Sequence, residues 1–317
     1  MARALKYFAF HPRTNSLYRM YSTAHPTYLH VRTPLHAGTG AELGVVDLPI
    51  QRERATGFPK VEGSSLKGAI REAFRHIDDD TVSEDDSTLL FGPDSTEVDL
   101  HAGALGFTDA RLLCFPVKSA RGVFAWITCP AVLRRWREDL AFAGVELDLD
   151  LPASNEIPSG SLLPMPSGDD EKIVILEEFA HTLTESEKAR EVGDWIGRHV
   201  LNMAGFTDQL VVLDNDAFRD YVEMATEVIT RTKINSATGT VATGQLFTEE
   251  YLPAESLLYF VTMASPLRVE ERAETALGDT TDPSGKDVLS FFADRCPETI
   301  QIGANATIGK GLVRVFR

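Results

Sequence analysis

The sequence contains little cysteine and no long apolar run. Its three cysteines, Cys114, Cys129 and Cys296, form no C-x-x-C pair and lack histidines at zinc-ligand spacing. A disulfide framework and a structural zinc site are therefore not expected, and buried, reduced thiols fit a cytoplasmic protein. No apolar segment approaches the about 20 residues that a membrane-spanning helix requires, so we expect no membrane association.

Positive charge is also scarce, although it is concentrated in places. Lys and Arg total 31 against 47 Asp and Glu, which gives a formal net charge of −16. This balance argues against a protein that coats nucleic acid indiscriminately. However, no acidic residue precedes Glu42, and the segment 303–317 carries only positive charge. An acidic body with basic local surfaces is compatible with a specific site for a polyanion.

Several catalytic motifs are missing. The glycine-rich segment 303–309 is one residue too long for a phosphate-binding Walker loop, and Gly311 stands where such a loop has Ser or Thr. The sequence has no H-E-x-x-H zinc motif and no G-x-S-x-G nucleophile elbow. These absences argue against an NTPase, a zinc site and a serine hydrolase. The glycine-rich segment is either a plain β-turn or a turn that lets a nucleic-acid backbone approach Lys310.

Segments with strand and helix periodicity alternate irregularly along the chain. Residues 27–34 alternate in polarity as a half-buried strand does, and 62–77 show helical spacing. Ser64 or Ser65 is the expected N-cap of that helix. Two later strands are separated by the turn 118–122, which is too short for a parallel crossover. The pattern predicts an α+β fold with a mainly antiparallel sheet and large insertions.

A β-hairpin is predicted at about 228–253, where two alternating runs flank a turn-rich segment. Glu249 and Tyr251 lie on its second strand and point to the same face, because side chains two apart do so. Glu249 could transfer a proton or coordinate a metal, and Tyr251 could stack on a base. The alternative is an exposed glutamate beside a half-buried tyrosine.

The stretch GVVDLPIQRER places Asp47 among apolar neighbours, shortly before Arg52 and Arg54. Asp47 is either a turn residue or an acid that acts on a ligand held by these arginines. His36 lies earlier on the same loop system. It could form an acid/base pair with Asp47, because histidine titrates near neutral pH.

Three groups of motifs follow one another along the chain. They are the segment 35–71, with its D-x-P-I-Q-R-E-R and S-L-K-G-x-x-R elements, the hairpin segment 238–253 and the glycine-rich tail 301–315. Together they closely resemble the backbone RAMP subunit of type III-B CRISPR effector (Cmr) complexes. The resemblance covers nearly the whole chain, from about Tyr28 onward. Ala304 departs from the family pattern, which commonly has glycine there.

The resemblance implies a fold and a set of partners. The fold would be a modified ferredoxin-like (RRM-like) palm with an antiparallel sheet, large insertions and a β-hairpin thumb. Residues 1–26 would form an N-terminal extension, and 27–317 a single RAMP domain. Copies of the chain would stack along a CRISPR RNA guide as a helical filament, together with other subunits of the Cmr complex.

The resemblance also implies an activity. Each copy would cut a complementary target RNA once, so that cuts fall at regular intervals and leave 2′,3′-cyclic phosphate and 5′-hydroxyl ends. Asp47 occupies the cleaving position of the family, and His36, Glu249 and Tyr251 match residues implicated in cleavage. Dependence on Mg²⁺ or Mn²⁺ is implied, with Asp47 as a candidate ligand. The alternative is a non-catalytic structural subunit that binds guide RNA, in which Asp47 is a turn residue.

A further set of residues is expected to bind RNA. Lys67 and Arg71 of the S-L-K-G-x-x-R element share one helix face and match the positions that hold the guide backbone in the family. The full expected RNA-binding set is Gln51, Arg52, Arg54, Ser65, Lys67, Arg71, Asn305 and Lys310.

Overall fold

The computed structural model describes residues 20–41, 44–77, 82–93, 101–165, 172–234, 241–267 and 283–317, without the side chains of 233–234 and 241–245. Most of the expected N-terminal extension, residues 1–19, lies outside these ranges. The first strand begins at Thr23, ahead of the expected start at 27, because Thr23 already pairs with Ala264 of a central strand.

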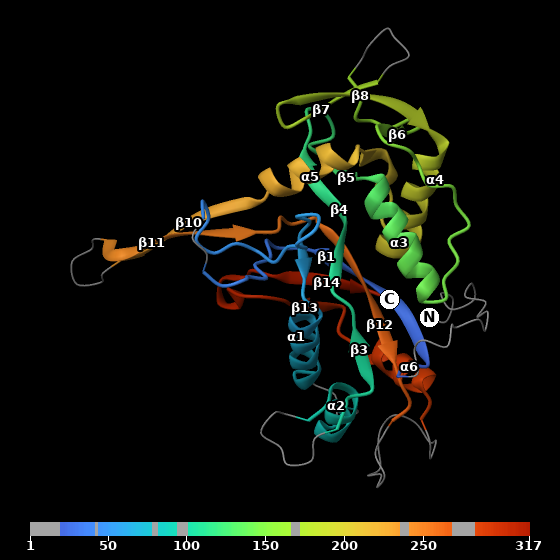
Figure 1. Ribbon diagram of the computed structural model, residues 1–317, viewed down its shortest axis with the longest axis vertical. Helices are drawn as coiled ribbons and strands as arrows, with labels where there is room; N and C mark the ends of the chain where they lie inside the picture. Colours follow the sequence, from blue (N-terminus) through green and yellow to red (C-terminus); the bar gives the residue numbers. More distant parts are fainter. Residues whose placement is uncertain are drawn as a thin grey trace.

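One large sheet forms the centre of the fold (Figure 1). Its strands are β1 Thr23–Val31, β2 Lys60–Val61, β3 Leu105–Phe107, β4 Ala110–Lys118, β5 Phe124–Thr128, β6 Glu156–Pro158, β7 Lys172–Leu176, β8 Phe179–Ser186, β9 Leu210–Val212, β12 Leu257–Ala264, β13 Thr299–Gln301 and β14 Leu312–Phe316. In the described residues the main path runs β13-β14-β1-β12-β4-β5-β9-β6-β8-β7, with β2 beside β4 and β3 beside β12. The pairs β5–β9 and β6–β8 are parallel and the other pairs of this sheet are antiparallel. The predicted α+β fold with a mainly antiparallel sheet is confirmed.

The helices form two groups, one in the lower and one in the upper part of the molecule (Figure 1). They are α1 Gly63–Arg75, α2 Glu84–Phe91, α3 Pro130–Phe142, α4 Glu187–Trp195, α5 Asn215–Met224 and α6 Gly285–Arg295. In Figure 1, α1, α2 and α6 lie near the lower end, and α3, α4 and α5 near the upper end. Within the described part of the chain, no helix is long and apolar enough to cross a membrane.

The start of α1 differs from the prediction. The helix begins at Gly63 with Glu62 as its N-cap, so the expected N-cap at Ser64 or Ser65 is wrong. The reason is a tertiary contact, because the Gly63 amide donates to Asp109 Oδ1 at 2.9 Å. A carboxylate from another part of the chain therefore satisfies a helix-terminal amide that local sequence would assign to a serine.

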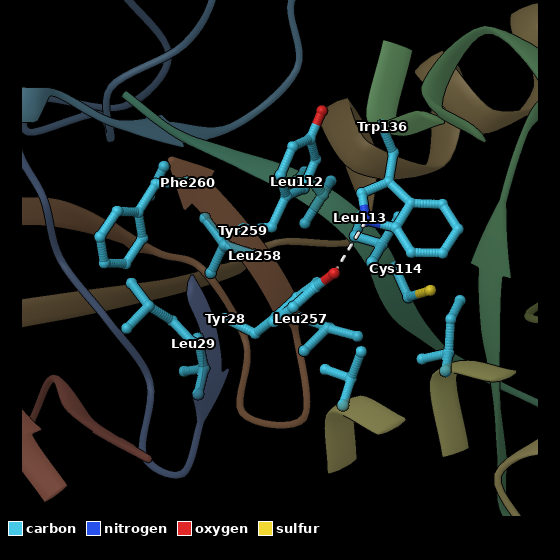
Figure 2. Packing of buried hydrophobic residues seen from close by; sticks show 14 of the residues in the cluster. Tyr28, Leu29, Leu112, Leu113, Cys114, Trp136, Leu257, Leu258, Tyr259 and Phe260 are labelled. Atoms are coloured by element: carbon cyan, nitrogen blue, oxygen red, sulfur yellow. Dashed lines mark hydrogen bonds between the residues drawn. The ribbon is translucent and has the colours of Figure 1, made fainter. Parts of the chain in front are cut away.

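The core packs β1, β4 and β12 against α3 (Figure 2). Leu29, Leu113 and Phe260 come from the three strands and are fully buried. Trp136 of α3 is also fully buried, and its indole Nε1 donates to the Tyr28 hydroxyl at 3.3 Å. Because β12 directly follows the hairpin in the chain, this core anchors the base of the hairpin.

The predicted hairpin at about 228–253 corresponds to strands β10 Glu227–Ile234 and β11 Val241–Tyr251. These two strands form a separate antiparallel sheet that projects sideways from the rest of the molecule (Figure 1). Glu227 lies opposite Tyr251 at the base of the hairpin, and Thr230 lies opposite Thr248. One edge of β11 is thus paired with β10, which leaves its other edge for the loops that carry the candidate active site.

Candidate active site

The second edge of β11 holds both loop residues that were predicted to be catalytic. The Leu48 amide donates to the Thr248 carbonyl, and the Glu250 amide donates to the Leu48 carbonyl, each at 3.0 Å. Further along this edge, His36 Nδ1 donates to the Glu250 carbonyl at 2.6 Å. The loop that carries Asp47 and the loop that carries His36 therefore lie side by side on one strand.

Asp47 is exposed, and its carboxylate is held through one oxygen. Oδ2 accepts hydrogen bonds from the Thr248 amide at 2.7 Å and from the Thr248 hydroxyl at 2.9 Å. The amide, followed by the hydroxyl, holds the pKa of Asp47 below its ordinary value, because both donors favour the ionised form. Among the described residues Oδ1 has no hydrogen-bond partner, so this oxygen is available to a ligand.

Glu249 and Tyr251 are buried, with exposed fractions of 4% and 0%. Because side chains alternate along a strand, they point to the face of β11 opposite to that of Thr248. The Tyr251 hydroxyl donates to Glu249 Oε2 at 2.5 Å, and His36 Nε2 lies 3.7 Å from Glu249 Oε1. The structure brings His36, Glu249 and Tyr251 together in one buried cluster. No contact in the described residues joins Asp47 to the side chains of this cluster.

Two more side chains complete the buried cluster. Arg231 Nε donates to Glu249 Oε2 at 2.6 Å. Asn305 Nδ2 donates to Glu249 Oε1 at 2.6 Å and to the Tyr251 hydroxyl at 3.0 Å. Burial opposes the ionisation of Glu249, but its hydrogen-bond donors outweigh burial and hold its pKa below the ordinary value. The Asn305 amide, expected to bind RNA, is thus engaged in holding a buried carboxylate.

Lys310 reaches the same cluster from the glycine-rich tail. Its Nζ lies 4.9 Å from the centroid of the Tyr251 ring, which is a cation–π contact. The tail is fixed to the His36 loop, because the Ala304 amide donates to the His36 carbonyl at 3.0 Å. Ala304 is not among the residues with positive φ, so alanine fits where the family commonly has glycine.

At Gly303 the glycine-rich tail approaches the His36 loop closely. It has φ +82°, and a Cβ added there would lie 2.2 Å from the His36 carbonyl oxygen. Gly309 has φ +74°, but nothing lies within 4 Å of an added Cβ. We expect Gly303→Ala to lower the free energy of unfolding by about 2 kcal/mol, through backbone strain and the clash. Gly309→Ala carries only the strain and should cost about 1 kcal/mol. Urea denaturation of both variants checks this, and equal losses would contradict the close approach.

Arg52 and Arg54 lie in different environments although they are close in sequence. The Arg52 guanidinium donates to Glu250 Oε1 at 2.5 Å and to the carbonyls of Gly57 and Val222 at 2.8 and 2.9 Å. These donors are directed into the protein, and they tie the Asp47 loop to β11. Arg54 is exposed, so its side chain remains a predicted RNA contact.

The other expected RNA-binding residues lie on or beside α1. Gln51 Nε2 lies 3.5 Å from the hydroxyl of Ser65, which is exposed. Lys67 is half-buried, and its Nζ donates to the Leu105 carbonyl at 3.2 Å beside a cavity of about 300 Å³. Burial, together with the neighbouring charge of Arg71, holds the pKa of Lys67 below its ordinary value. Lys67 and Arg71 do share one side of the helix, as their spacing predicted.

Asp47 is the candidate ligand for Mg²⁺ or Mn²⁺. No group of three or more His, Cys, Asp or Glu within the described ranges could hold a metal ion. Mg²⁺ at phosphates is usually held by one or two carboxylates, with water and phosphate oxygens completing the shell. The available Oδ1 of Asp47 fits that mode, in which the RNA supplies part of the coordination.

Three residues that contact the predicted site were missed at the sequence level, namely Arg231, Thr248 and Glu250. Arg231 lies diagonally across the hairpin from Glu249, since Ile229 is directly opposite Glu249. The alternating polarity of the first hairpin strand indicated the face on which Arg231 lies. The residue that Arg231 meets on β11 depends on the register of the two strands, which the sequence does not show. Nothing in the sequence pointed to a role for Thr248 except its position next to Glu249.

The family model for the RAMP superfamily matches residues 28–314, and the chain belongs to this superfamily. It is 36% identical over 294 residues to the CRISPR system Cmr endoribonuclease Cmr4 of Pyrococcus furiosus, which covers 90% of this chain and 93% of that protein. It is also 25% identical to the CRISPR system CMR subunit Cmr4 of Saccharolobus solfataricus, over 93% of this chain and 96% of that protein. These matches confirm the resemblance to the backbone RAMP subunit.

Solved structures support the same relationship. A crystal structure of oligomeric Cmr4 from Pyrococcus furiosus superposes with a TM-score of 0.67 and 30% identity, over 93% of this chain and 98% of that chain. A chain in the cryo-EM structure of type III-B Cmr-beta bound to cognate target RNA has a TM-score of 0.71. Its identity is 22%, over 94% of this chain and 98% of that chain, so this likeness concerns the fold alone. The modified ferredoxin-like fold of the RAMP proteins is thereby confirmed.

Proposed function

We propose that this chain is a CRISPR RNA-guided endoribonuclease subunit of a type III-B effector complex, acting in the cytoplasm. It would bind a guide RNA with further copies of itself and with other subunits, and cleave complementary target RNA at regular intervals. The 36% identity to a relative named an endoribonuclease supports this proposal. The observation in this structure that carries it is the exposed Asp47 carboxylate, which β11 holds through Oδ2 while Oδ1 stays available.

RNA supplies its own nucleophile, so the protein has to position groups and manage charge. The 2′-hydroxyl attacks the adjacent phosphorus and the P–O5′ bond breaks. The products then carry a 2′,3′-cyclic phosphate and a 5′-hydroxyl, whose oxygen takes its proton from solvent. Asp47 is ionised at neutral pH, so its Oδ1 acts as the acceptor of the 2′-hydroxyl proton or as a metal ligand. A Mg²⁺ or Mn²⁺ ion, when bound, supplies stabilisation of the negative charge on the phosphate.

His36, Glu249 and Tyr251 would support cleavage by positioning. Their exposed fractions of 6%, 4% and 0% keep them from direct contact with RNA in this conformation. His36 Nδ1 is occupied by the Glu250 carbonyl, on the same strand edge that holds Asp47. The buried cluster would therefore fix the edge of β11 on which Asp47 is mounted.

RNA recognition would rest on the guide. Base pairing between guide and target would select the sequence, while the protein contacts the backbone and reads shape. Exposed Arg54 and the half-buried pair Lys67 and Arg71 are the proposed backbone contacts of this chain.

The proposal is tested with the guide-loaded complex and two labelled RNAs, one complementary to the guide and one scrambled. We expect regularly spaced cuts in the complementary RNA alone, and loss of cutting when EDTA removes divalent metal. Tight binding of an uncut complementary RNA would instead support the structural subunit. Cutting that resists EDTA would overturn the metal requirement and leave the nuclease assignment in place.

A further inference from the structure

One residue of β11, Thr248, holds the carboxylate of Asp47. The Thr248 hydroxyl donates to Asp47 Oδ2 at 2.9 Å and also accepts from the Asp47 amide at 2.9 Å. The Thr248 amide adds a third bond, to the same Oδ2, at 2.7 Å. Together the three hydrogen bonds fix both the backbone and the side chain of Asp47 against β11.

The neighbouring loop residues that the structure describes offer the carboxylate no other support. Gly44 and Val45 on its N-terminal side are exposed, and Val45 as a whole residue is 100% exposed. On its C-terminal side the backbone of Leu48 pairs with β11, but this bond does not involve the carboxylate. Of all the side chains described, that of Thr248 is the one that hydrogen-bonds to the Asp47 carboxylate.

We infer that Thr248 is a positioning residue for RNA cleavage. It holds Asp47 Oδ2 against the strand and so presents Oδ1 to the scissile phosphate. This inference rests on the proposed function, because it concerns the geometry of the same reaction. Thr248 acts through Asp47, to which its hydroxyl and amide are bonded, and not on the reacting atoms.

The hydroxyl of Thr248 is the part of the side chain that matters. Thr248→Val keeps the shape and the strand preference of the residue but removes the acceptor of the Asp47 amide and one donor to Oδ2. Thr248→Ser keeps the hydroxyl and therefore both hydrogen bonds. Thr230→Val is the matched control, because Thr230 lies directly opposite Thr248 on β10 and is exposed.

The test measures single-turnover cleavage by the guide-loaded complex at saturating target RNA. We expect Thr248→Val to slow cleavage about 10- to 100-fold, the range for a misplaced catalytic group, with unchanged affinity for target RNA. Thr248→Ser should restore most of the rate, and Thr230→Val should cut like the wild type. A Thr248→Val complex that cuts at the wild-type rate, or a Ser variant as slow as the Val variant, would overturn the inference.

A second measurement is independent of cleavage. Amide hydrogen exchange of Asp47 in the full-length chain reports whether the Thr248 hydroxyl holds that residue. The Asp47 amide donates to this hydroxyl at 2.9 Å, so we expect Thr248→Val to speed the exchange of that amide and Thr248→Ser to leave it unchanged. If the wild-type complex leaves the target intact, the proposed function fails, whereas unchanged exchange in Thr248→Val overturns the role of Thr248 alone.

Discussion

Replacing Asp47 with alanine leaves the target RNA bound but uncut. The expected loss in cleavage rate is about 100- to 10,000-fold, the contribution of a positioned group that handles protons or charge. Binding should be unchanged, because Asp47 is exposed and the backbone of the next residue, Leu48, still pairs with β11. Single-turnover cleavage and filter binding with the guide-loaded complex measure the two quantities separately.

A matched control for this variant is Asp150→Ala. Asp150 is also exposed, and it forms a surface ion pair with Lys188 at 3.0 Å. Its removal should change neither cleavage nor binding, because exposed ion pairs contribute little. Loss of guide binding or of assembly in Asp47→Ala, with an intact Asp150→Ala complex, would support the turn interpretation of Asp47 and the structural alternative.

Arg52→Met and Arg54→Met should separate a structural arginine from an RNA-binding one. Glu250 is 5% exposed, and without Arg52 its carboxylate loses its 2.5 Å ion-pair partner. We expect Arg52→Met to lower the free energy of unfolding by about 3 kcal/mol, since an uncompensated buried charge remains. Urea denaturation of the purified chain measures this loss.

Arg54→Met should leave the stability of the chain nearly unchanged and weaken RNA binding. Its exposed side chain has no described partner to lose, so stability should change by less than about 0.5 kcal/mol. Loss of one phosphate contact should weaken RNA binding by the complex. The slope of log affinity against log salt concentration should become shallower by about 1. If Arg52→Met were as stable as the wild type and bound RNA with a reduced salt dependence, the internal role of Arg52 would be wrong.

Local periodicity accounts for the part of the fold that could be predicted. The hairpin strands β10 and β11 alternate in polarity, and this signal needs no knowledge of the rest of the chain. The order of the sheet and the partner of each strand depend on long-range contacts. The start of α1 shows the same limit, because Asp109 satisfies the Gly63 amide from outside the local sequence.

The candidate site was predictable as a set of residues but not as an arrangement. Motif order pointed to Asp47, His36, Glu249 and Tyr251, yet nothing in the motifs separates an exposed acid from a buried cluster. Arg52 appeared equivalent to Arg54 because its partner, Glu250, lies 198 positions away in the chain.

The central claim is that the Asp47 of each copy performs one cut. It is tested most directly by assembling complexes from mixtures of wild-type and Asp47→Ala chains and mapping the cuts in one end-labelled target. The account predicts that every cut weakens in direct proportion to the wild-type fraction, while target binding stays constant. Cutting that persists at full rate in complexes made entirely of Asp47→Ala chains would contradict it.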